Sequence, residues 1–352
     1  MTATEVPAFR AALLGWFDVE ARALPWRGET DPYRILVSEV MLQQTQVATV
    51  VGYYERFLAA CPSLADLAAT PLDEVLRLWQ GLGYYHRARR LHALAHQVVA
   101  TRDGCLPTEP GALRHLPGIG DYTAGAVASI AFGRRCPAVD GNVTRVLSRL
   151  FALPGDPRAV ARRHAAELVD AARPGDHNQA LMELGATVCT PRPACAVCPV
   201  QRFCAALASG EPTRWPEAPP RKPPRERLHV AAVVRRAGRL LLGQRPAEGR
   251  WAGLWELPRV ELAPTDDAAE GLRMGLLANL GVTSRVGPAL AELHHAVSGE
   301  RIRLVAHECE LTGSPRPLGY VALCWADGET GHLALATPQR RLLRLLVALG
   351  AP

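Results

Sequence analysis

The sequence is almost without lysine. Of its 40 Lys and Arg residues, only Lys222 is a lysine, and all the others are arginines. Because a guanidinium group stays protonated in proteins, arginine cannot act as an amine nucleophile. A mechanism in which a side-chain amine forms a Schiff base with the substrate is therefore nearly excluded.

Long apolar runs and strongly charged segments are missing as well. No apolar stretch reaches the length of a membrane span, and the N-terminus has acidic residues where a secretory signal would be basic and then apolar. The net charge is +6 over 352 residues, which is compatible with binding nucleic acid through a local basic patch but does not require it. We expect a cytoplasmic protein that does not associate with membranes.

The pattern of apolar residues divides the chain into two domains. Residues 1–210 have apolar side chains at helical spacing, in residues 33–60, 72–80, 84–101, 111–132, 141–153, 158–172 and 176–188. Residues 211–227 are rich in proline and charge and are expected to form a linker. Residues 228–352 are expected to form a smaller α+β domain. Its predicted strands are 228–236, 239–245, 301–311 and 320–326, and its predicted helices are 267–280 and 337–349.

Four of the nine cysteines are crowded into one short segment, with the spacing Cys189-x5-Cys195-x2-Cys198-x5-Cys204. In a cytosolic protein such crowding indicates a metal site rather than disulfides. Four thiolates can hold an iron–sulfur cluster or a zinc ion. Zinc sites usually pair two short C-x2-C units, and this segment has only one. Because no catalytic acid lies within it, we expect a structural role.

Residues 113–127, with the sequence LRHLPGIGDYTAGAV, predict two helices joined by a tight turn. Gly118 and Gly120 allow the backbone to approach a partner closely. The N–H groups at the start of the second helix can then bind a phosphate. An ordinary turn between helices is the alternative, but the L-P-G-I-G frame and the small residues that follow favour phosphate binding.

Two carboxyl groups are candidates for catalysis. Glu39 lies in the segment YRILVSEVMLQQTQV, where apolar neighbours would desolvate the carboxyl, raise its pKa and keep it protonated as a general acid requires. A place on the solvent face of an amphipathic helix is the alternative. Asp140 precedes a helix expected from residue 142, so it can cap that helix and still face a cleft.

The segments SEVMLQQTQV, LWQGLGYYHRARRL, LPGIGDYTAGAV and VDGNVTRVL, with the four-cysteine segment after them, resemble the adenine DNA glycosylase family. The resemblance covers nearly the whole chain. It implies a mainly α helix–hairpin–helix DNA glycosylase with a [4Fe–4S] loop, followed by an α+β Nudix-like domain. The family removes adenine mispaired with 8-oxoguanine or guanine from double-stranded DNA, and we expect a monomeric enzyme with this activity.

The resemblance implies a role for each matching residue. Glu39 would protonate the adenine and Asp140 would stabilise the sugar oxocarbenium ion, with Tyr122 and Asn142 in support. The remaining residues would line the adenine pocket, contact the DNA or bind the cluster. These sets are Arg27, Leu42, Val47 and Glu183 for the pocket, Gln44, Thr45, Leu82, Tyr84, Gly118 and Gly120 for the DNA, and Cys189, Cys195, Cys198 and Cys204 for the cluster.

The sequence departs from the family pattern in four places. Tyr122 stands where relatives that also cleave the strand have a lysine, so we expect base excision alone. The first gap between cysteines is one residue shorter than usual. The Nudix-like domain lacks the R-E-x2-E-E helix that binds metal in true Nudix hydrolases, so pyrophosphate hydrolysis is not expected. Its recognition loop is expected at residues 295–299, where His295 and Ser298 remain as DNA contacts but the aromatic residue and the second histidine are absent.

Three other functions compete with this one. An endonuclease III-like glycosylase for oxidised pyrimidines would need the hairpin lysine and normally lacks the second domain. A DNA-binding protein without catalysis is disfavoured by the presence of both Glu39 and Asp140. A hydrolase of free nucleotides is disfavoured by the missing metal helix.

Overall fold

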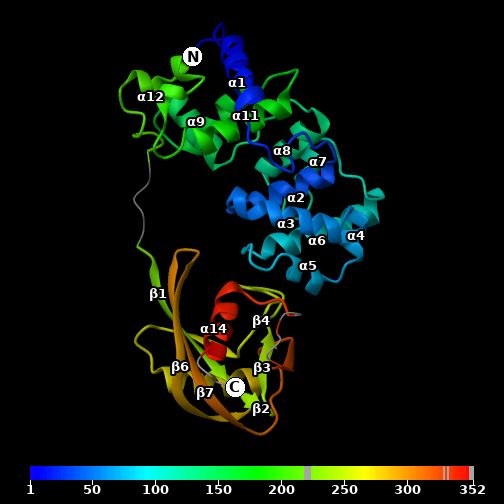
Figure 1. Ribbon diagram of the computed structural model, residues 1–352, viewed down its shortest axis with the longest axis vertical. Coiled ribbons are helices and arrows are strands. Elements are labelled where there is room, and N and C mark those ends of the chain that lie inside the picture. Colours follow the sequence, from blue (N-terminus) through cyan, green and yellow to red (C-terminus); the bar gives the residue numbers. More distant parts are fainter. Residues whose placement is uncertain (218–222, 328–329, 331–332, 349–352) are drawn as a thin grey trace. The chain divides into compact units, whose positions relative to one another are not determined.

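The computed structural model describes residues 1–217, 223–327, 330 and 333–348, which fall into two compact units (Figure 1). The first unit comprises Met1–Ala69 and Arg90–Pro220, and the second comprises Thr70–Arg89 and Arg221–Pro352. The segment Thr70–Arg89 therefore comes from the helical half of the sequence but belongs to the unit that contains the strands. No helix in the described ranges combines the length and the apolar character that a membrane span requires.

The first unit is helical, as the spacing of its apolar residues predicts. The stretch of helical spacing from residue 33 to 60 forms two helices, because Gln44 has a left-handed φ of 58° that a helix cannot continue. The helices are α1 (Val6–Glu20), α2 (Pro32–Leu42), α3 (Val47–Ala60), α4 (Leu64–Ala69), most of α6 (His86–Arg102), α7 (Pro110–Leu113), α8 (Asp121–Phe132), α9 (Gly141–Phe151), α10 (Pro157–Leu168), α11 (Pro174–Thr187) and α12 (Ala205–Ala208), while α5 (Leu72–Leu78) lies in the second unit.

A core cluster shared by α1, α9 and α11 holds the start of α9 in place. Val143, Val146, Leu147 and Leu150 of α9 recur at helical spacing, and all four are buried in this cluster. The segment of residues 189–204, which contains the four cysteines, packs against the same cluster. The N-terminus of α9 and the cysteine segment are therefore fixed by one set of contacts.

Two glycines allow close helix packing near residue 140. A Cβ atom added to Gly125 of α8 would lie within 2.1 Å of the carbonyl oxygen of Pro137, and one added to Gly185 of α11 would lie 2.7 Å from the Cβ atom of Asn142. Both distances are shorter than any real carbon contact. Helices α8 and α11 can therefore approach the segment that contains Asp140 only because these positions lack a side chain.

The second unit contains two four-stranded sheets. In the larger one the order is β5-β1-β7-β6, with β1 parallel to β7 and the other neighbours antiparallel. In the smaller one β3 pairs with β2, β4 and β8. The elements are β1 (Arg225–Val233), β2 (Arg235–Arg236), β3 (Arg239–Gln244), β4 (Trp255–Glu256), β5 (Arg259–Leu262), α13 (Ala268–Leu280), β6 (Thr283–Val297), β7 (Glu300–Thr312), β8 (Ala322–Ala326) and α14 (Thr337–Ala348).

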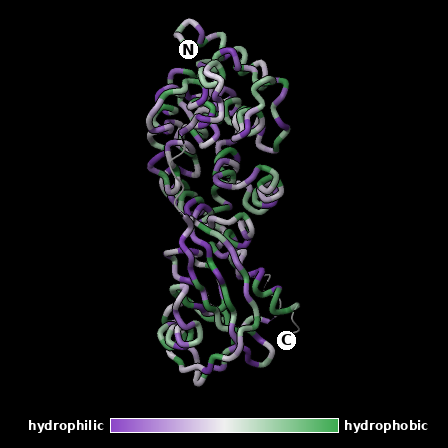
Figure 2. Tube along the Cα trace, turned by 90° about the vertical axis from the view of Figure 1, so that its left-hand side faces the viewer, coloured by the Kyte–Doolittle hydropathy of each residue, from purple (hydrophilic) through white to green (hydrophobic). Residues whose placement is uncertain are grey.

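Strand β1 of the larger sheet is buried on both faces from Leu228 onward, because a helix packs against each face. Val230 and Ala232 of β1 share a core cluster with leucines of α13, whereas Ala231 and Val233 share another with leucines of α14. Successive residues of a strand point to opposite faces, so consecutive apolar residues suit this position. Figure 2 shows hydrophobic and hydrophilic segments interleaved along the chain of this unit.

The second domain differs in two ways from the one that the sequence predicts. Strand β1 begins at Arg225, inside the segment 211–227 that we expected to be a linker, and residues 218–222 of that segment lie outside the described residues. Strands β4, β5 and β6 were not predicted at all.

Strand β6 changes the surroundings of the expected recognition loop. His295 lies on β6 opposite Ile302, and Val297 pairs with Glu300, so only Ser298 and Gly299 connect β6 to β7. These two residues have φ angles of 50° and 78°, and positive φ at both central positions is typical of a type I′ hairpin turn. The prediction of a loop over residues 295–299 is therefore wrong, because most of it is strand.

We expect Gly125→Ala to lower the free energy of unfolding by about 1–3 kcal/mol, because the added methyl group forces α8 away from Pro137. Gly15→Ala is the matched control: Gly15 lies on the exposed side of α1 with nothing within 4 Å of an added Cβ. That change should raise stability by roughly 0.5–1 kcal/mol through backbone entropy. Urea unfolding followed by circular dichroism measures both, and equal shifts would contradict the close contact at Gly125.

Candidate active site

Glu39 is a buried acid on α2. Its side chain is 5% exposed, and seven of its neighbours on the helix, Tyr33, Ile35, Leu36, Val37, Ser38, Val40 and Met41, are buried with it. The phenol of Tyr122, on α8, donates a hydrogen bond of 2.5 Å to Oε2 of Glu39. Burial and the negative charge of Asp140 raise the pKa of Glu39 to about 7, and the Tyr122 hydrogen bond and Arg27 partly oppose the rise. Glu39 can therefore hold a proton near neutral pH.

Asp140 caps helix α9. Its Oδ1 accepts a hydrogen bond of 2.6 Å from the backbone N–H of Val143, and its Oδ2 accepts one of 3.1 Å from the side-chain amide of Asn142. Burial raises the pKa of Asp140, while these hydrogen bonds and the charge of Arg145 oppose the rise because they favour the ionised form. The capping role and a position beside a second acid are thus compatible.

A buried ion-pair network lies between the chain after α1 and helix α11. Glu183 of α11 is 3% exposed and accepts hydrogen bonds from Arg22 (2.5 Å) and Arg27 (2.9 Å). Arg27 also donates to Gln179, and its guanidinium lies 4.8 Å from the ring of Phe17. Because the charge of Arg27 also lowers the pKa of Glu39, this network belongs to the surroundings of the acid. Arg22 and Gln179 were not singled out from the sequence.

The polar residues after α2 are less enclosed. Gln44 is exposed, Leu42, Thr45 and Val47 are partly buried, and Gln43 donates a hydrogen bond of 3.2 Å to Thr123 of α8. The link through Thr123 joins the end of α2 to the helix that presents Tyr122. This arrangement leaves Gln44 in a left-handed conformation at the surface of the first unit.

The turn between α7 and α8 has the geometry that a backbone phosphate site needs. Gly118 has a φ of 80°, and a Cβ atom there would lie 2.7 Å from the Cβ of Arg90. Gly120 is the N-cap of α8 and no side chain caps the first amides of that helix. Those N–H groups are available to an anion.

The four cysteines, Cys189, Cys195, Cys198 and Cys204, line one small cavity together with Arg149. Burial and the neighbouring thiols raise the pKa of Cys198 to about 11. In the described part of the chain, no three His, Cys, Asp or Glu side chains converge as they would around a single ion. Four thiols around one cavity are a ligand set that both zinc ions and iron–sulfur clusters use.

Arg145 connects the cysteine segment to Asp140. Its guanidinium donates to the carbonyl of Cys189 (2.8 Å), to the carbonyl of Gly185 (2.6 Å) and to the side-chain oxygen of Asn142 (2.8 Å). Asn142 in turn donates to Asp140. The sequence analysis missed this arginine, although its position three residues after Asn142 places both on one side of α9.

The second unit brings together three of the remaining residues. Tyr84, His295 and Ser298 line a cavity of about 460 Å³. Leu82, from the same part of the chain as Tyr84, is buried, and its carbonyl accepts a hydrogen bond from Arg87. The cavity also includes Arg250, which was not predicted.

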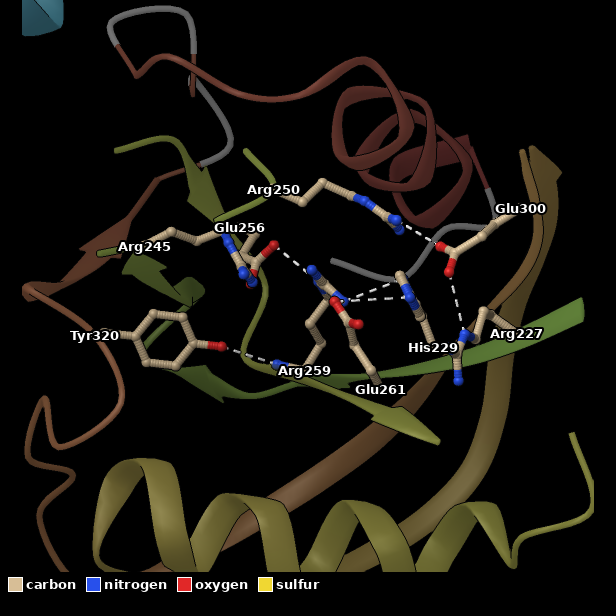
Figure 3. Close-up of polar contacts among 9 residues, drawn as sticks. All are labelled: Arg227, His229, Arg245, Arg250, Glu256, Arg259, Glu261, Glu300 and Tyr320. Atoms are coloured by element: carbon tan, nitrogen blue, oxygen red, sulfur yellow. Dashed lines mark hydrogen bonds and ion pairs between the residues drawn. The ribbon is translucent and has the colours of Figure 1, made fainter. Parts of the chain in front are cut away.

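A buried network of charged residues lies within the sheet region of this unit (Figure 3). Arg259 is 4% exposed and bonds to Glu256 (2.8 Å), to Glu261 (3.0 Å) and to the ring of His229 (3.0 Å). The phenol of Tyr320 accepts the backbone N–H of Arg259. Because a buried charge is costly unless it is paired, these bonds compensate the burial of Arg259 and link the start of β5 to β1 and β4.

Comparison with known proteins agrees with the division of the chain into a helical part and a part that contains the strands. Residues 37–171 match a family described as "HhH-GPD superfamily base excision DNA repair protein", and residues 229–345 match the NUDIX domain. A solved structure of a thermostable thymine-DNA glycosylase matches 58% of this chain and 98% of its own, with a TM-score of 0.55 and 30% identity. The fold class that the sequence predicts, a helix–hairpin–helix glycosylase followed by a Nudix-like domain, is therefore confirmed.

Two curated relatives extend the match over almost the full sequence. An adenine DNA glycosylase of Mus musculus is 40% identical over 97% of this chain and 78% of its own length. One of Homo sapiens is also 40% identical, over 97% of this chain and 74% of its own length. By this identity and coverage the chain belongs to the adenine DNA glycosylase family, whose members hydrolyse an N-glycosidic bond in DNA.

Proposed function

We propose that the protein excises adenine mispaired with 8-oxoguanine or guanine in double-stranded DNA, with Glu39 as the general acid and Asp140 as the group that stabilises the sugar cation. The observation that carries the proposal is the buried Glu39, with a pKa of about 7, under the influence of the charge of Asp140. Two carboxyls in different surroundings can divide the roles of acid and ionised partner. The curated relatives are named for activity on adenine.

The reaction follows from these two groups. The adenine nucleotide must leave the base stack to reach a buried acid. Glu39 gives its proton to the base as the bond between the sugar and adenine breaks, and the bonding electrons leave with the protonated base. The ionised Asp140 stabilises the positive charge that remains on the sugar, and water completes the hydrolysis. Asn142 and Tyr122 hold the two carboxyls through the hydrogen bonds described above.

The surroundings of the two acids supply the adenine pocket in this proposal. Arg27 and Glu183 would present polar groups to the edge of the base, while Leu42 and Val47 would contact its faces. Gly118 and Gly120 would bind a phosphate of the strand through backbone N–H groups. Excision would proceed without an attacking lysine, since Tyr122 occupies the position where relatives that cleave the strand have one, and the sequence contains a single lysine, Lys222.

The base opposite adenine would be read by residues outside this pocket. We assign Gln44, Thr45, Leu82 and Tyr84 to contacts with bases inside the DNA double helix. His295 and Ser298 are assigned to the edge of 8-oxoguanine. Ser298 is exposed at the tip of the β6–β7 hairpin, so its hydroxyl is accessible to a base edge. A hydrogen bond of this kind contributes about 1 kcal/mol, which would favour 8-oxoguanine over guanine modestly.

We assign a [4Fe–4S] cluster to Cys189, Cys195, Cys198 and Cys204, because four cysteine thiols around one cavity are the ligand set of such a cluster. The cluster would supply a rigid scaffold for the segment and no step of the hydrolysis. Arg145 and Arg149 donate hydrogen bonds to the carbonyl oxygen of Cys189, so the backbone of the segment is tied to α9.

We expect Glu39→Gln and Asp140→Asn each to slow single-turnover release of adenine by at least about 100-fold, the usual contribution of a general acid or its electrostatic partner. Duplex binding should change little, because both groups act on charge that develops in the transition state. Glu55→Gln, at an exposed position on α3, is the control and should react at the normal rate.

The assay uses duplexes with A opposite 8-oxoguanine, A opposite G, and thymine glycol. Release of thymine glycol in preference to adenine would favour the endonuclease III-like alternative.

The rate of excision should fall as the pH rises above about 7, where Glu39 loses its proton. The hydrogen bond from Tyr122 stabilises the ionised carboxyl and lowers its pKa, so Tyr122→Phe should move this fall to higher pH. Single-turnover rates measured from roughly pH 5 to 9 test the shift, because this range covers the titration of Glu39 on both sides of neutrality. A fall that moves to lower pH would show that Tyr122 stabilises the protonated form.

Purified protein should contain iron, and Cys198→Ser should lower both the iron content and the affinity for DNA, because the segment loses its scaffold. Cys105→Ser, at an exposed cysteine outside the segment, should change neither. Elemental analysis and electronic absorption report the cluster, and a duplex titration reports the affinity. Stoichiometric zinc without iron after anaerobic purification would overturn the assignment.

A further inference from the structure

The cavity of the second unit has the size of a small-molecule site. Its volume is about 460 Å³, within the range of pockets that enclose a ligand as large as a nucleotide. Its described lining includes the aromatic side chains of Tyr84, Trp251 and His295 and the cationic side chains of Arg250 and Arg341. The contact of one hydroxyl with the edge of a base does not require a cavity of this volume.

The charge of the lining has one sign. None of the described residues that line the cavity is acidic. Arg250 pairs with Glu300, but Glu300 also pairs with Arg227, so these three residues retain one positive charge (Figure 3). Arg341, exposed on α14, has no hydrogen bond or ion pair among the described residues. The cavity therefore attracts an anion.

Two nitrogen atoms of the described lining side chains have no hydrogen-bond partner. Nη1 of Arg250 and Nε2 of His295 are buried without one in the described part of the chain. Buried polar atoms of this kind are rare in folded proteins unless a ligand or water satisfies them. Burial and the charges of Arg250, Arg259 and Arg341 lower the pKa of His295 to about 4, so its ring is neutral at pH 7.

The backbone is strained at two positions that line the cavity. Tyr84 and Trp251 have φ angles of 48° and 56°, in the left-handed region that favours glycine. Such conformations concentrate at ligand sites, where the surrounding structure maintains them. The two residues come from separate segments of the chain and line one cavity.

We propose that this cavity binds a nucleotide through its phosphate, with Arg341 and Arg250 as the phosphate subsite. Arginine suits this role because its planar group donates two hydrogen bonds to phosphate oxygens. The phosphate comes either from the strand opposite adenine or from a free nucleotide. If the phosphate comes from the DNA strand, the inference rests on the proposed function. The phosphate subsite is nevertheless separate from the reading of the base edge by Ser298.

The test compares Arg341→Gln with Arg344→Gln in the full-length protein. Both arginines are exposed on α14, and only Arg341 lines the cavity. In the first arm, calorimetry measures the binding of deoxyguanosine monophosphate and of deoxyguanosine, which lacks the phosphate. In the second arm, binding is measured over a range of salt concentrations on duplexes with a non-cleavable adenine analogue opposite 8-oxoguanine or guanine. Ser298→Ala is measured on the same duplexes.

We expect Arg341→Gln to weaken the binding of one of these ligands about fivefold or more, and Arg344→Gln to leave the binding of both unchanged. A loss confined to the monophosphate identifies a free nucleotide. An equal loss on both duplexes, with a salt dependence reduced by about one phosphate contact, identifies the strand. The proposal is wrong if the two arginine variants behave alike in both arms. If Ser298→Ala leaves the ratio of the two duplex affinities unchanged while Arg341→Gln still weakens binding, the proposed reading of 8-oxoguanine fails and the phosphate subsite stands.

Discussion

The burial of Glu39 is the constraint on which the first unit depends. A carboxyl group among buried apolar side chains is costly to ionise, so it keeps its proton near pH 7 and can act as an acid. It also needs a hydrogen-bond partner, which Tyr122 supplies from α8. Helix α8 has small buried residues and its Gly125 lies against Pro137, so the helix that carries Tyr122 also approaches the segment that contains Asp140 closely. Through α8, the two acids are therefore connected.

The near absence of lysine has a structural counterpart in the arginines around the cysteine segment. Arg145 bonds to two backbone carbonyls and to Asn142 at once, which the single ammonium of a lysine does less well. Through this one side chain, the segment with the four cysteines, helix α11 and the residue that holds Asp140 are connected. In the second unit, arginines similarly bridge several acids, and one of them, Arg341, remains unpaired beside a cavity without acidic lining residues in the described part of the chain.

Much of the fold followed from local patterns. Helical spacing predicted the helices of the first unit because each buries one apolar side, and the alternate burial of β1 on two faces accounts for its continuous apolar run. Strand β6 escaped prediction for a physical reason. It contains Gly287 and Pro288, which normally interrupt a strand, and its register shifts twice between Val286 and Ala291, so its side chains do not alternate regularly. Only pairing with β7 makes it a strand.

The sequence by itself determined the identity of the candidate acids, the crowding of the cysteines and the helical or strand character of most segments, because these depend on neighbours within a few residues. The tertiary structure decided the rest. It pairs Glu39 with Tyr122 and Arg27 with Glu183, and it places Arg145 between Asn142 and the cysteine segment. It also gathers Tyr84, Arg250, His295 and Arg341 around one cavity. These residues lie far apart along the chain, and their proximity depends on how helices and sheets pack, which no local spacing of residues specifies.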